Sequence, residues 1–327
     1  MKSDISWHNE AWKKYTHACS QQHLPHALLI TGLNGVGKSI FANKMVKSLL
    51  CINSIKFIAC EQCRSCKTYN SGANPDYLGV KLLEGKQQIS VDQIRQLSAF
   101  LNHTRSFDGY RVVLIEPVER MNHNAANSLL KCLEEPSANT VIILVSENIN
   151  SILPTIKSRC QRLSLPFPSR KVALSWLEKN KNNSDNLEEL LTISNGSPLI
   201  ALDFPENLLN LKSDFENDLS FALSERVSVA EVAKNWEKQN HDTLLAWQII
   251  WVQKLIKNQV LSKDYNDRSN TENQLFSLMR KVSTPQLWSL YHSLISQKHY
   301  IHTSVNSLIF IENMIMLWLR AKTNINQ

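Results

Sequence analysis

The sequence predicts an α/β fold in which a three-layer domain with a parallel sheet comes first and helices alone follow. Between residues 26 and 165, short apolar runs of strand length alternate with segments whose apolar residues fall on one helical face. From about residue 207 onward only the helical spacing recurs. The 43% hydrophobic and 20% charged residues, with only 8 glycines among 327, are typical of a folded globular protein and argue against disorder or repeats.

Five apolar runs are predicted to be the strands of the sheet. The first follows Pro25 and precedes a glycine-rich loop, as a buried parallel strand should. Ser90 is a good N-cap for the helix after it, and Pro136 ends another helix. The predicted strands are residues 26–31, 77–80, 111–115, 140–145 and 161–165, and the predicted helices are residues 38–50, 90–102, 124–135 and a short one within 151–160.

Proline and serine mark a boundary after the last predicted strand. Residues 166–169 read Pro-Phe-Pro-Ser, a composition typical of a linker. We therefore expect a nucleotide-binding type of domain at 1–166, a small helical lid at 167–206 and a helical C-terminal domain at 207–327.

The charge balance permits a polyanionic partner without demanding one. The chain has 36 basic and 29 acidic residues, a net charge of +7, and the excess is spread along the sequence. Residues 1–10 lack the apolar core of a signal peptide, and no run of about 18 apolar residues occurs. We expect a cytoplasmic protein that does not contact a membrane.

Residues 31–39 read Thr-Gly-Leu-Asn-Gly-Val-Gly-Lys-Ser and contain a complete Walker A pattern between a predicted strand and a predicted helix. Gly32, Gly35 and Gly37 let backbone amides surround phosphate oxygens, and the helix N-terminus adds positive potential. Lys38 is expected to reach the outer phosphates and Ser39 to bind magnesium. The loop therefore predicts binding of ATP or ADP with Mg²⁺, with a chance glycine-rich turn as the weaker alternative.

The residues that would hydrolyse a bound nucleotide are incomplete. In ATPases of this type an acidic residue at a strand end helps to hold magnesium, and Glu116 can do so. Many such enzymes place a glutamate next that orients the attacking water, but here Pro117 follows, and its side chain cannot polarise water. Glu119 is close in sequence but lies in the following turn, so the sequence gives no reason to place it in the site.

Four cysteines fall within sixteen residues, with the spacing Cys-x8-Cys-x2-Cys-x2-Cys. In a chain without an export signal, disulfides are disfavoured, whereas four thiolates at this spacing can close a tetrahedral zinc site. Such a closed site folds a module and catalyses nothing. We predict structural zinc, with a reactive redox pair as the alternative, at Cys51, Cys60, Cys63 and Cys66; Cys19, Cys132 and Cys160 are expected to be ordinary small core residues.

Ser158-Arg159-Cys160 falls where a short predicted helix ends and a strand begins. The planar, charged guanidinium of Arg159 could contact the phosphate of a neighbouring subunit, where it suits the charge that develops on a transferring phosphoryl group. A surface arginine in an ordinary salt bridge is the alternative. Taken alone, the residue favours that alternative.

Three motifs together favour the contact of Arg159 with a neighbouring subunit's phosphate over an ordinary salt bridge. They are residues 122–136, Asn-His-Asn-Ala-Ala-Asn-Ser-Leu-Leu-Lys-Cys-Leu-Glu-Glu-Pro, the strand Thr-Val-Ile-Ile-Leu-Val at 140–145, and Ile-Lys-Ser-Arg-Cys at 156–160. This combination resembles the AAA+ clamp-loader subunits of bacterial DNA polymerase III, in which Asn-Ala-Leu-Leu-Lys-x-Leu-Glu-Glu-Pro and Ser-Arg-Cys recur and the cysteine spacing is similar. The resemblance covers about residues 20–205 through motifs and the rest only through helical character.

Two kinds of subunit in that family look alike: the hydrolysing motor subunit, gamma/tau, and the delta-prime subunit, which lends an arginine without turning over ATP. Three departures from the motor pattern favour delta-prime. Pro117 replaces the catalytic glutamate, residues 196–199 (Gly-Ser-Pro-Leu) lack the arginine of the motor lid, and residues 146–148 (Ser-Glu-Asn) replace Thr-Thr-Asp. The Walker A loop is nevertheless intact, unlike that of many delta-prime proteins.

The resemblance implies a role in DNA replication within a nucleotidyltransferase holoenzyme. The chain would place Arg159 against ATP on an adjacent motor subunit, in a hetero-pentamer with gamma/tau and delta subunits that loads the beta sliding clamp onto primer-template DNA. Its C-terminal helices would pack in the collar of that complex. Whether the chain hydrolyses ATP itself is left open.

Two other functions compete with this one. The chain could be an active motor in which Glu116 or Glu119 acts in an unusual arrangement, and it would then hydrolyse ATP by itself. It could instead be a zinc-dependent nucleic-acid-binding protein that uses residues 51–66 as its contact module, with steeply salt-dependent affinity. Few aromatic residues are available for stacking in that module, which ranks this function lowest.

Overall fold

The computed structural model describes residues 5–181, 187–205, 207–260, 274–301 and 306–323. The chain forms two compact units, Met1–Asp203 and Phe204–Gln327. The boundary expected near residue 166 lies inside the first unit, and the one expected near residue 206 lies close to the division between the units.

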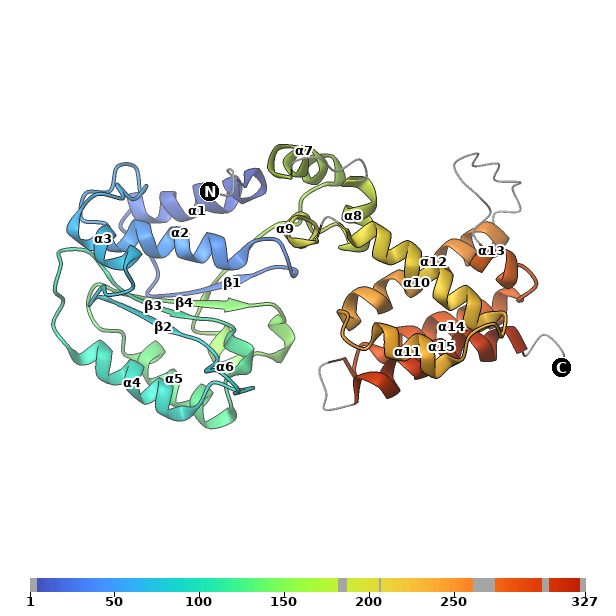
Figure 1. Cartoon of the computed structure of the whole chain (residues 1–327). Helices are drawn as coiled ribbons and strands as arrows, with labels where there is room; N and C mark the ends of the chain where they lie inside the picture. Colours follow the sequence, from blue (N-terminus) through green and yellow to red (C-terminus); the bar gives the residue numbers. More distant parts are fainter. Residues whose placement is uncertain (1–4, 182–186, 206, 261–273, 302–305, 324–327) are drawn as a thin grey trace. The chain divides into compact units, whose positions relative to one another are not determined.

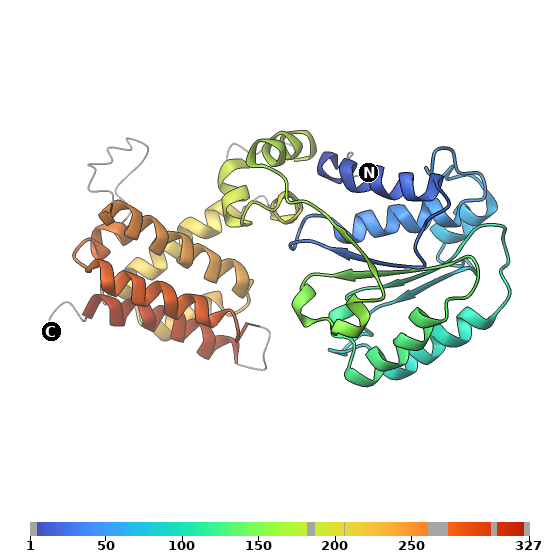
Figure 2. The same cartoon turned by 180° about the vertical axis from the view of Figure 1, so that it is seen from behind.

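A five-stranded parallel sheet forms the centre of the first unit (Figure 1 and Figure 2). The strand order is β2-β3-β4-β1-β5, so the strand before the Walker A loop lies between the last two strands. The predicted parallel sheet is confirmed, with all five strands in the expected segments. The strands are β1 (Ala27–Thr31), β2 (Tyr77–Val80), β3 (Arg111–Ile115), β4 (Thr140–Ser146) and β5 (Gln161–Ser164).

Helices cover both faces of the sheet, which is why its central strands read as unbroken apolar runs. On one face lie α1 (Asn9–Ser20) and α2 (Lys38–Leu50), and on the other lie α4 (Val91–Asn102) and α5 (His123–Glu134) (Figure 1). Every residue of β1, β3 and β4 is buried. The predicted three-layer arrangement is therefore present.

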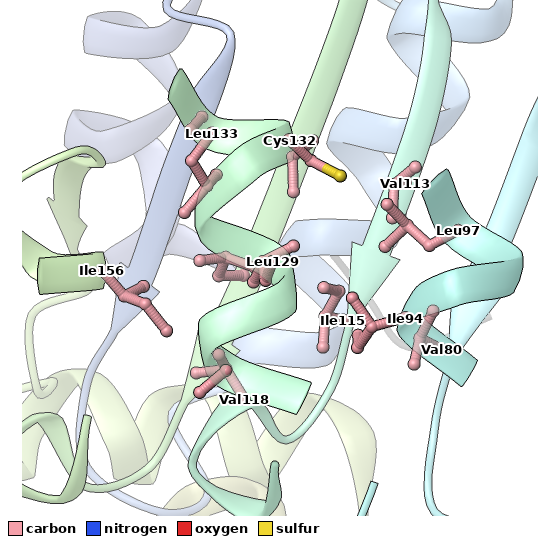
Figure 3. Close-up of a cluster of buried hydrophobic side chains, with 14 of the residues drawn as sticks. Val80, Ile94, Leu97, Val113, Ile115, Val118, Leu129, Cys132, Leu133 and Ile156 are labelled. Carbon is pink, nitrogen blue, oxygen red and sulfur yellow. The ribbon is translucent and has the colours of Figure 1, made fainter. Parts of the chain in front are cut away.

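The core between the sheet and helices α4 and α5 joins residues from strands β1 to β4 with residues from both helices. Leu97 of α4, Leu129 of α5 and Ile115 of β3 are all 0% exposed and meet in this cluster (Figure 3). Both helices start at side-chain caps: Ser90 forms a capping box with Gln93, and Asn122 accepts a hydrogen bond from the amide of Ala125.

Shorter elements complete the first unit. The sequence pattern did not predict α1 or the short α3 (Arg64–Asn70) within the cysteine-rich insert. Three 3-10 helices are η1 (Ser6–His8), η2 (Val118–Arg120) and η3 (Ile149–Ser151). The remaining helices of this unit are α6 (Pro154–Lys157), α7 (Arg170–Asn180), α8 (Leu187–Ile193) and α9 (Pro198–Asp203).

The second unit consists of helices alone in its described residues, as the sequence predicts. Its core contains tryptophans that are 2% exposed or less, among them Trp247, Trp251 and Trp318. None of the helices in the described parts of the chain is long and apolar enough to span a membrane. The helices are α10 (Leu208–Leu223), α11 (Val229–Trp236), α12 (His241–Val260), α13 (Gln274–Met279), α14 (Thr284–Gln297) and α15 (Ser307–Thr323).

Candidate nucleotide, metal and arginine sites

The Walker A residues form a loop between the carboxyl end of β1 and the amino end of α2, as expected. Gly35 and Gly37 have φ angles of +74° and +90°, a region in which a side chain is strained. Gly37 is the N-cap of α2, so the first amides of that helix point out of its amino end toward the loop. This is the backbone arrangement that binds phosphate oxygens at a helix N-terminus.

Lys38 lies against its own loop. Its Nζ donates hydrogen bonds of 3.0 Å to the carbonyl oxygens of Gly32 and Leu33, and the residue is 6% exposed. Burial lowers the pKa of the ammonium group from its usual value, and nearby carboxylates oppose that shift. A phosphate that reached the loop would offer the ammonium group stronger, charge-assisted acceptors than these carbonyls.

Ser39 and Glu116 meet across the site. The hydroxyl of Ser39, in the first turn of α2, donates a hydrogen bond to the carboxylate of Glu116, which directly follows β3. The two residues predicted to hold magnesium are therefore neighbours. The next residue, Pro117, is joined to Glu116 by a cis peptide bond and carries no group that could orient water.

A cavity of about 560 Å³ opens beside Glu116. Its wall includes two acidic residues that the sequence analysis had not placed in the site, Glu119 and Glu147. The amide of Glu147 donates a hydrogen bond of 2.9 Å to the carboxylate of Glu119. The carboxylates of Glu147, Glu119 and Glu116 all oppose the effect of burial, which lowers the pKa of Lys38. The remaining lining residues are Leu82, Pro117, Arg120, Val145, Asn148 and Ser151.

Sheet topology explains why these acids converge. Strands β3 and β4 are adjacent and parallel, and Glu116 and Glu147 each follow one of them directly. Residues that follow neighbouring parallel strands meet at the same edge of a sheet, where ligands of open α/β folds bind. This rule could have identified Glu147, whereas Glu119 reaches the cavity only because η2 turns the chain back.

The segment predicted to be the lid contacts the Walker A loop. A Cβ atom added to Gly35 would lie 1.8 Å from Ser197 Oγ, and one added to Gly37 would lie 2.9 Å from Leu199 Cδ1. From the amino-terminal side, the indole Nε1 of Trp7 donates a hydrogen bond of 2.9 Å to the carbonyl of Val36. The loop is thus enclosed by two segments remote in sequence.

The four cysteines of the insert converge. Their sulfur atoms all lie within 4.8 Å of one another, and this group could bind a metal ion. Sγ of Cys51 is 3.5 Å from that of Cys60 and 4.0 Å from that of Cys63. A tetrahedral zinc ion with Zn–S bonds of about 2.3 Å separates its sulfurs by about 3.8 Å, so the donor set fits zinc.

The surroundings favour the thiolate at two of the four cysteines, Cys60 and Cys63, whereas burial raises the pKa of Cys51 and Cys66. Burial raises the pKa of Cys63, but hydrogen bonds from the amide and the side chain of Cys66 help to outweigh it, and the pKa falls to about 6. Amides also point at the sulfurs of Cys51 and Cys60, which accept hydrogen bonds of 3.3 Å from the amides of Cys60 and Cys63. Such amide donors stabilise the charged form that a metal requires.

Arg159 lies neither at the Walker A site nor in the cysteine group. It lies in the short connection between α6 and β5, and its side chain is 35% exposed. Nη1 donates hydrogen bonds to the carbonyl of Thr155 at 3.0 Å and to the hydroxyl of Ser158 at 3.4 Å, and Nη2 lies 2.5 Å from a carboxylate oxygen of Glu134. The guanidinium is therefore accessible at the surface and held by its own subunit.

Comparison with known proteins finds relatives among the subunits of DNA polymerase III. Residues 7–169 match the family model described as "DNA polymerase III, delta subunit". The chain is 30% identical to DNA polymerase III subunit delta' of Pseudomonas aeruginosa over 97% of this chain and 98% of that protein. It is also 30% identical to DNA polymerase III subunit gamma of Buchnera aphidicola, over 62% of this chain and 56% of that protein.

Among solved structures, a gamma subunit-related protein of DNA polymerase III from Thermotoga maritima aligns with 94% of this chain and 99% of its own. The sequence identity is 18% and the TM-score is 0.46. The match to the Pseudomonas aeruginosa delta' subunit spans nearly the full length of both sequences. This chain belongs to the delta-prime subunit family of DNA polymerase III.

Proposed function

We propose that the chain works in a clamp-loader complex as a subunit that does not hydrolyse ATP itself and supplies Arg159 to the ATP of a neighbouring motor subunit. The position of Arg159 carries this proposal: the guanidinium is partly exposed, presented by a short helix that is packed on the domain core. A guanidinium at that position can neutralise the charge that develops on a transferring phosphoryl group.

The composition of the chain's own site supports the absence of hydrolysis. Pro117 stands where a water-orienting glutamate would follow Glu116. In the lid, Ser197 is followed by Pro198 and Leu199, so no arginine contacts the loop from there. The site has groups for phosphate and magnesium but lacks two groups that hydrolysis commonly uses.

The chain's own loop is proposed to bind ATP or ADP with Mg²⁺ in a structural role. Gly32, Gly35, Gly37 and Lys38 would hold the phosphates, and Ser39 with Glu116 would hold the magnesium ion; the last two are already in contact. Because Lys38 is bonded to loop carbonyls, binding would exchange these bonds for bonds to phosphate.

The remaining assignments follow from family membership. The partners would be gamma/tau and delta subunits in a hetero-pentamer, the beta sliding clamp, and primer-template DNA reached through the complex, in the cytoplasm. The four-cysteine group would hold a structural zinc ion, since its sulfur spacing suits tetrahedral coordination. Zinc there would fold the insert rather than take part in catalysis.

Reconstitution of the complex tests the trans-acting role. The chain is combined with its motor and delta subunits as wild type or Arg159→Ala, and DNA- and clamp-stimulated ATP turnover is measured. We expect a large loss of ATP turnover at the site that this chain completes, since an arginine finger raises kcat roughly 10³-fold or more. The isolated chain serves as the control and should not hydrolyse ATP. Unchanged turnover with Arg159→Ala would remove the basis of the proposal.

One observation favours a second function, that of an active motor. Glu119 lines the same cavity as Glu116 and its carboxylate acts on the pKa of Lys38, so a carboxylate is available near the phosphate-binding loop after all. In that case the isolated chain hydrolyses ATP, and both Lys38→Ala and Glu119→Gln abolish the activity. Absence of ATP hydrolysis by the isolated chain would rule out this function.

A further inference from the structure

A second residue accompanies Arg159 at the surface. Glu134, the last residue of α5, lies 2.5 Å from Nη2 of Arg159, although the two residues are 25 positions apart in sequence. The two side chains are 35% and 49% exposed, so neither is sealed in the core. We infer that Glu134 is the positioning residue of Arg159, an inference that rests on the trans-acting role proposed above.

Helix formation does not explain a glutamate at this position. The carboxyl end of a helix carries partial negative charge, which disfavours an acidic side chain in the last turn. Glu134 nevertheless ends α5, and Glu135 follows it as the C-cap. The ion pair with Arg159 supplies Glu134 with a compensating partner, whereas the side chain of Glu135 has no ion pair among the described residues.

Glu134 and Arg159 both lie next to residues that are packed in the core. Ile156, three residues before Arg159, is 1% exposed and lies in the same cluster as Leu129 and Leu133 of α5 (Figure 3). The amide of Arg159 also donates a hydrogen bond of 3.1 Å to the carbonyl of Ile156. The backbones of Glu134 and Arg159 are therefore fixed relative to each other before either side chain is placed.

The hydrogen bonds fix the guanidinium and still leave donors. Nη1 binds the Thr155 carbonyl and the Ser158 hydroxyl, and Nη2 binds Glu134. A guanidinium has five N–H donors in one plane, so contacts on both terminal nitrogens determine the orientation of that plane. Nε donates to none of the described residues and remains free for a phosphate oxygen.

The expected role of Glu134 is thus to limit the orientations of a long, flexible side chain. Without the carboxylate, Arg159 keeps its charge but samples more rotamers, and fewer of them place it at a neighbour's phosphate. A half-exposed ion pair contributes little to folding stability, so a loss of activity without a loss of stability would separate positioning from a structural role.

The test uses the reconstituted complex with Glu134→Gln, which keeps the shape of the side chain and removes its charge. Glu135→Gln is the matched control, since it removes the adjacent charge but not the pair. We expect Glu134→Gln to lower kcat for stimulated ATP turnover about tenfold, as is typical when a group that orients a functional side chain is lost, with KM and Tm unchanged. Glu135→Gln should leave kcat as it is.

A double variant separates this inference from the proposed function. If Glu134 acts through Arg159, Glu134→Gln adds no further loss to Arg159→Ala. An additional loss in that background, or an equal effect of Glu135→Gln, overturns the positioning role. If Arg159→Ala lowers turnover and Glu134→Gln does not, the inference fails while the proposed function stands. If Arg159→Ala itself has no effect, the proposed function fails, and the inference fails with it.

Discussion

Ser39 donates a hydrogen bond to Glu116, and this bond joins the first turn of α2 to the end of β3. The residues that would hold magnesium are therefore placed together by the sheet and the helix, while the neighbouring position is occupied by Pro117. Under the function proposed above, this site binds a nucleotide without hydrolysing it, and this leads to the first prediction.

The isolated chain should bind Mg-ATP without turning it over, and Lys38→Ala should weaken binding at least tenfold. The ammonium group of Lys38 is the cation at the phosphate-binding loop, and a charge-assisted hydrogen bond to phosphate contributes about 1.5–3 kcal/mol. Titration calorimetry with a slowly hydrolysed ATP analogue measures the affinity. Lys14→Ala, which removes an exposed lysine of α1, is the control and should bind like wild type. Equal affinity of both variants would contradict a role for the loop.

Gly35→Ala should destabilise the chain more than Gly72→Ala does. Both glycines have nearly equal φ angles, +74° and +76°, so both substitutions carry a cost of about 1–2 kcal/mol for the left-handed conformation. Only at Gly35 would the new Cβ meet other atoms, Ser197 Oγ at 1.8 Å and Ile200 Cγ1 at 2.7 Å, and such overpacking adds about 1–3 kcal/mol.

Urea and thermal denaturation of the two glycine variants measure this difference. Because the left-handed penalty is common to both, their difference reports the contact between the lid and the Walker A loop. Equal destabilisation would mean that Ser197 does not lie against the loop in solution.

Purified chain should carry about one zinc ion, which Cys63→Ser should remove. The sulfur of Cys63 is one of four within 4.8 Å, and a closed site that loses a thiolate binds zinc far more weakly. Cys19→Ser is the control, since Cys19 lies outside the group. Metal content by mass spectrometry gives the answer. Metal binding requires deprotonated thiols, so zinc should also be released as the pH is lowered. Retention of zinc by Cys63→Ser would exclude this four-sulfur site.

Asp76→Ala should destabilise the first unit by about 1–3 kcal/mol, the usual cost of leaving polar groups unpaired away from water. Asp76 is 2% exposed, and its carboxylate accepts hydrogen bonds of 2.8–3.1 Å from the amides of Ser106 and Phe107. Asp108→Ala removes an exposed carboxylate from the same loop and should have a small effect. Urea titrations give the free energy of unfolding of both variants. Similar values would show that the hydrogen bonds of Asp76 do not stabilise the loop.

Much of the first unit could be predicted because its segments carry local signals. Central strands such as β3 and β4 are apolar along their whole length, since helices cover both faces of the sheet. The Walker A glycines and the clustered cysteines depend on short spacings that are visible in the sequence. By contrast, α1 buries only Ala11 and Tyr15, so its sequence carries few apolar residues that would indicate a helix.

The sequence by itself determined the chemistry available to this protein: a phosphate-binding loop, a proline in place of a glutamate, four thiols and a surface arginine. The tertiary structure decided which of these groups meet. Glu147 reaches the cavity beside Glu116 because β3 and β4 are adjacent in the sheet, and Glu119 reaches it because η2 turns the chain back. Glu134 reaches Arg159 because α6 packs on α5. Such pairings depend on contacts between segments far apart along the chain, which local periodicity does not encode.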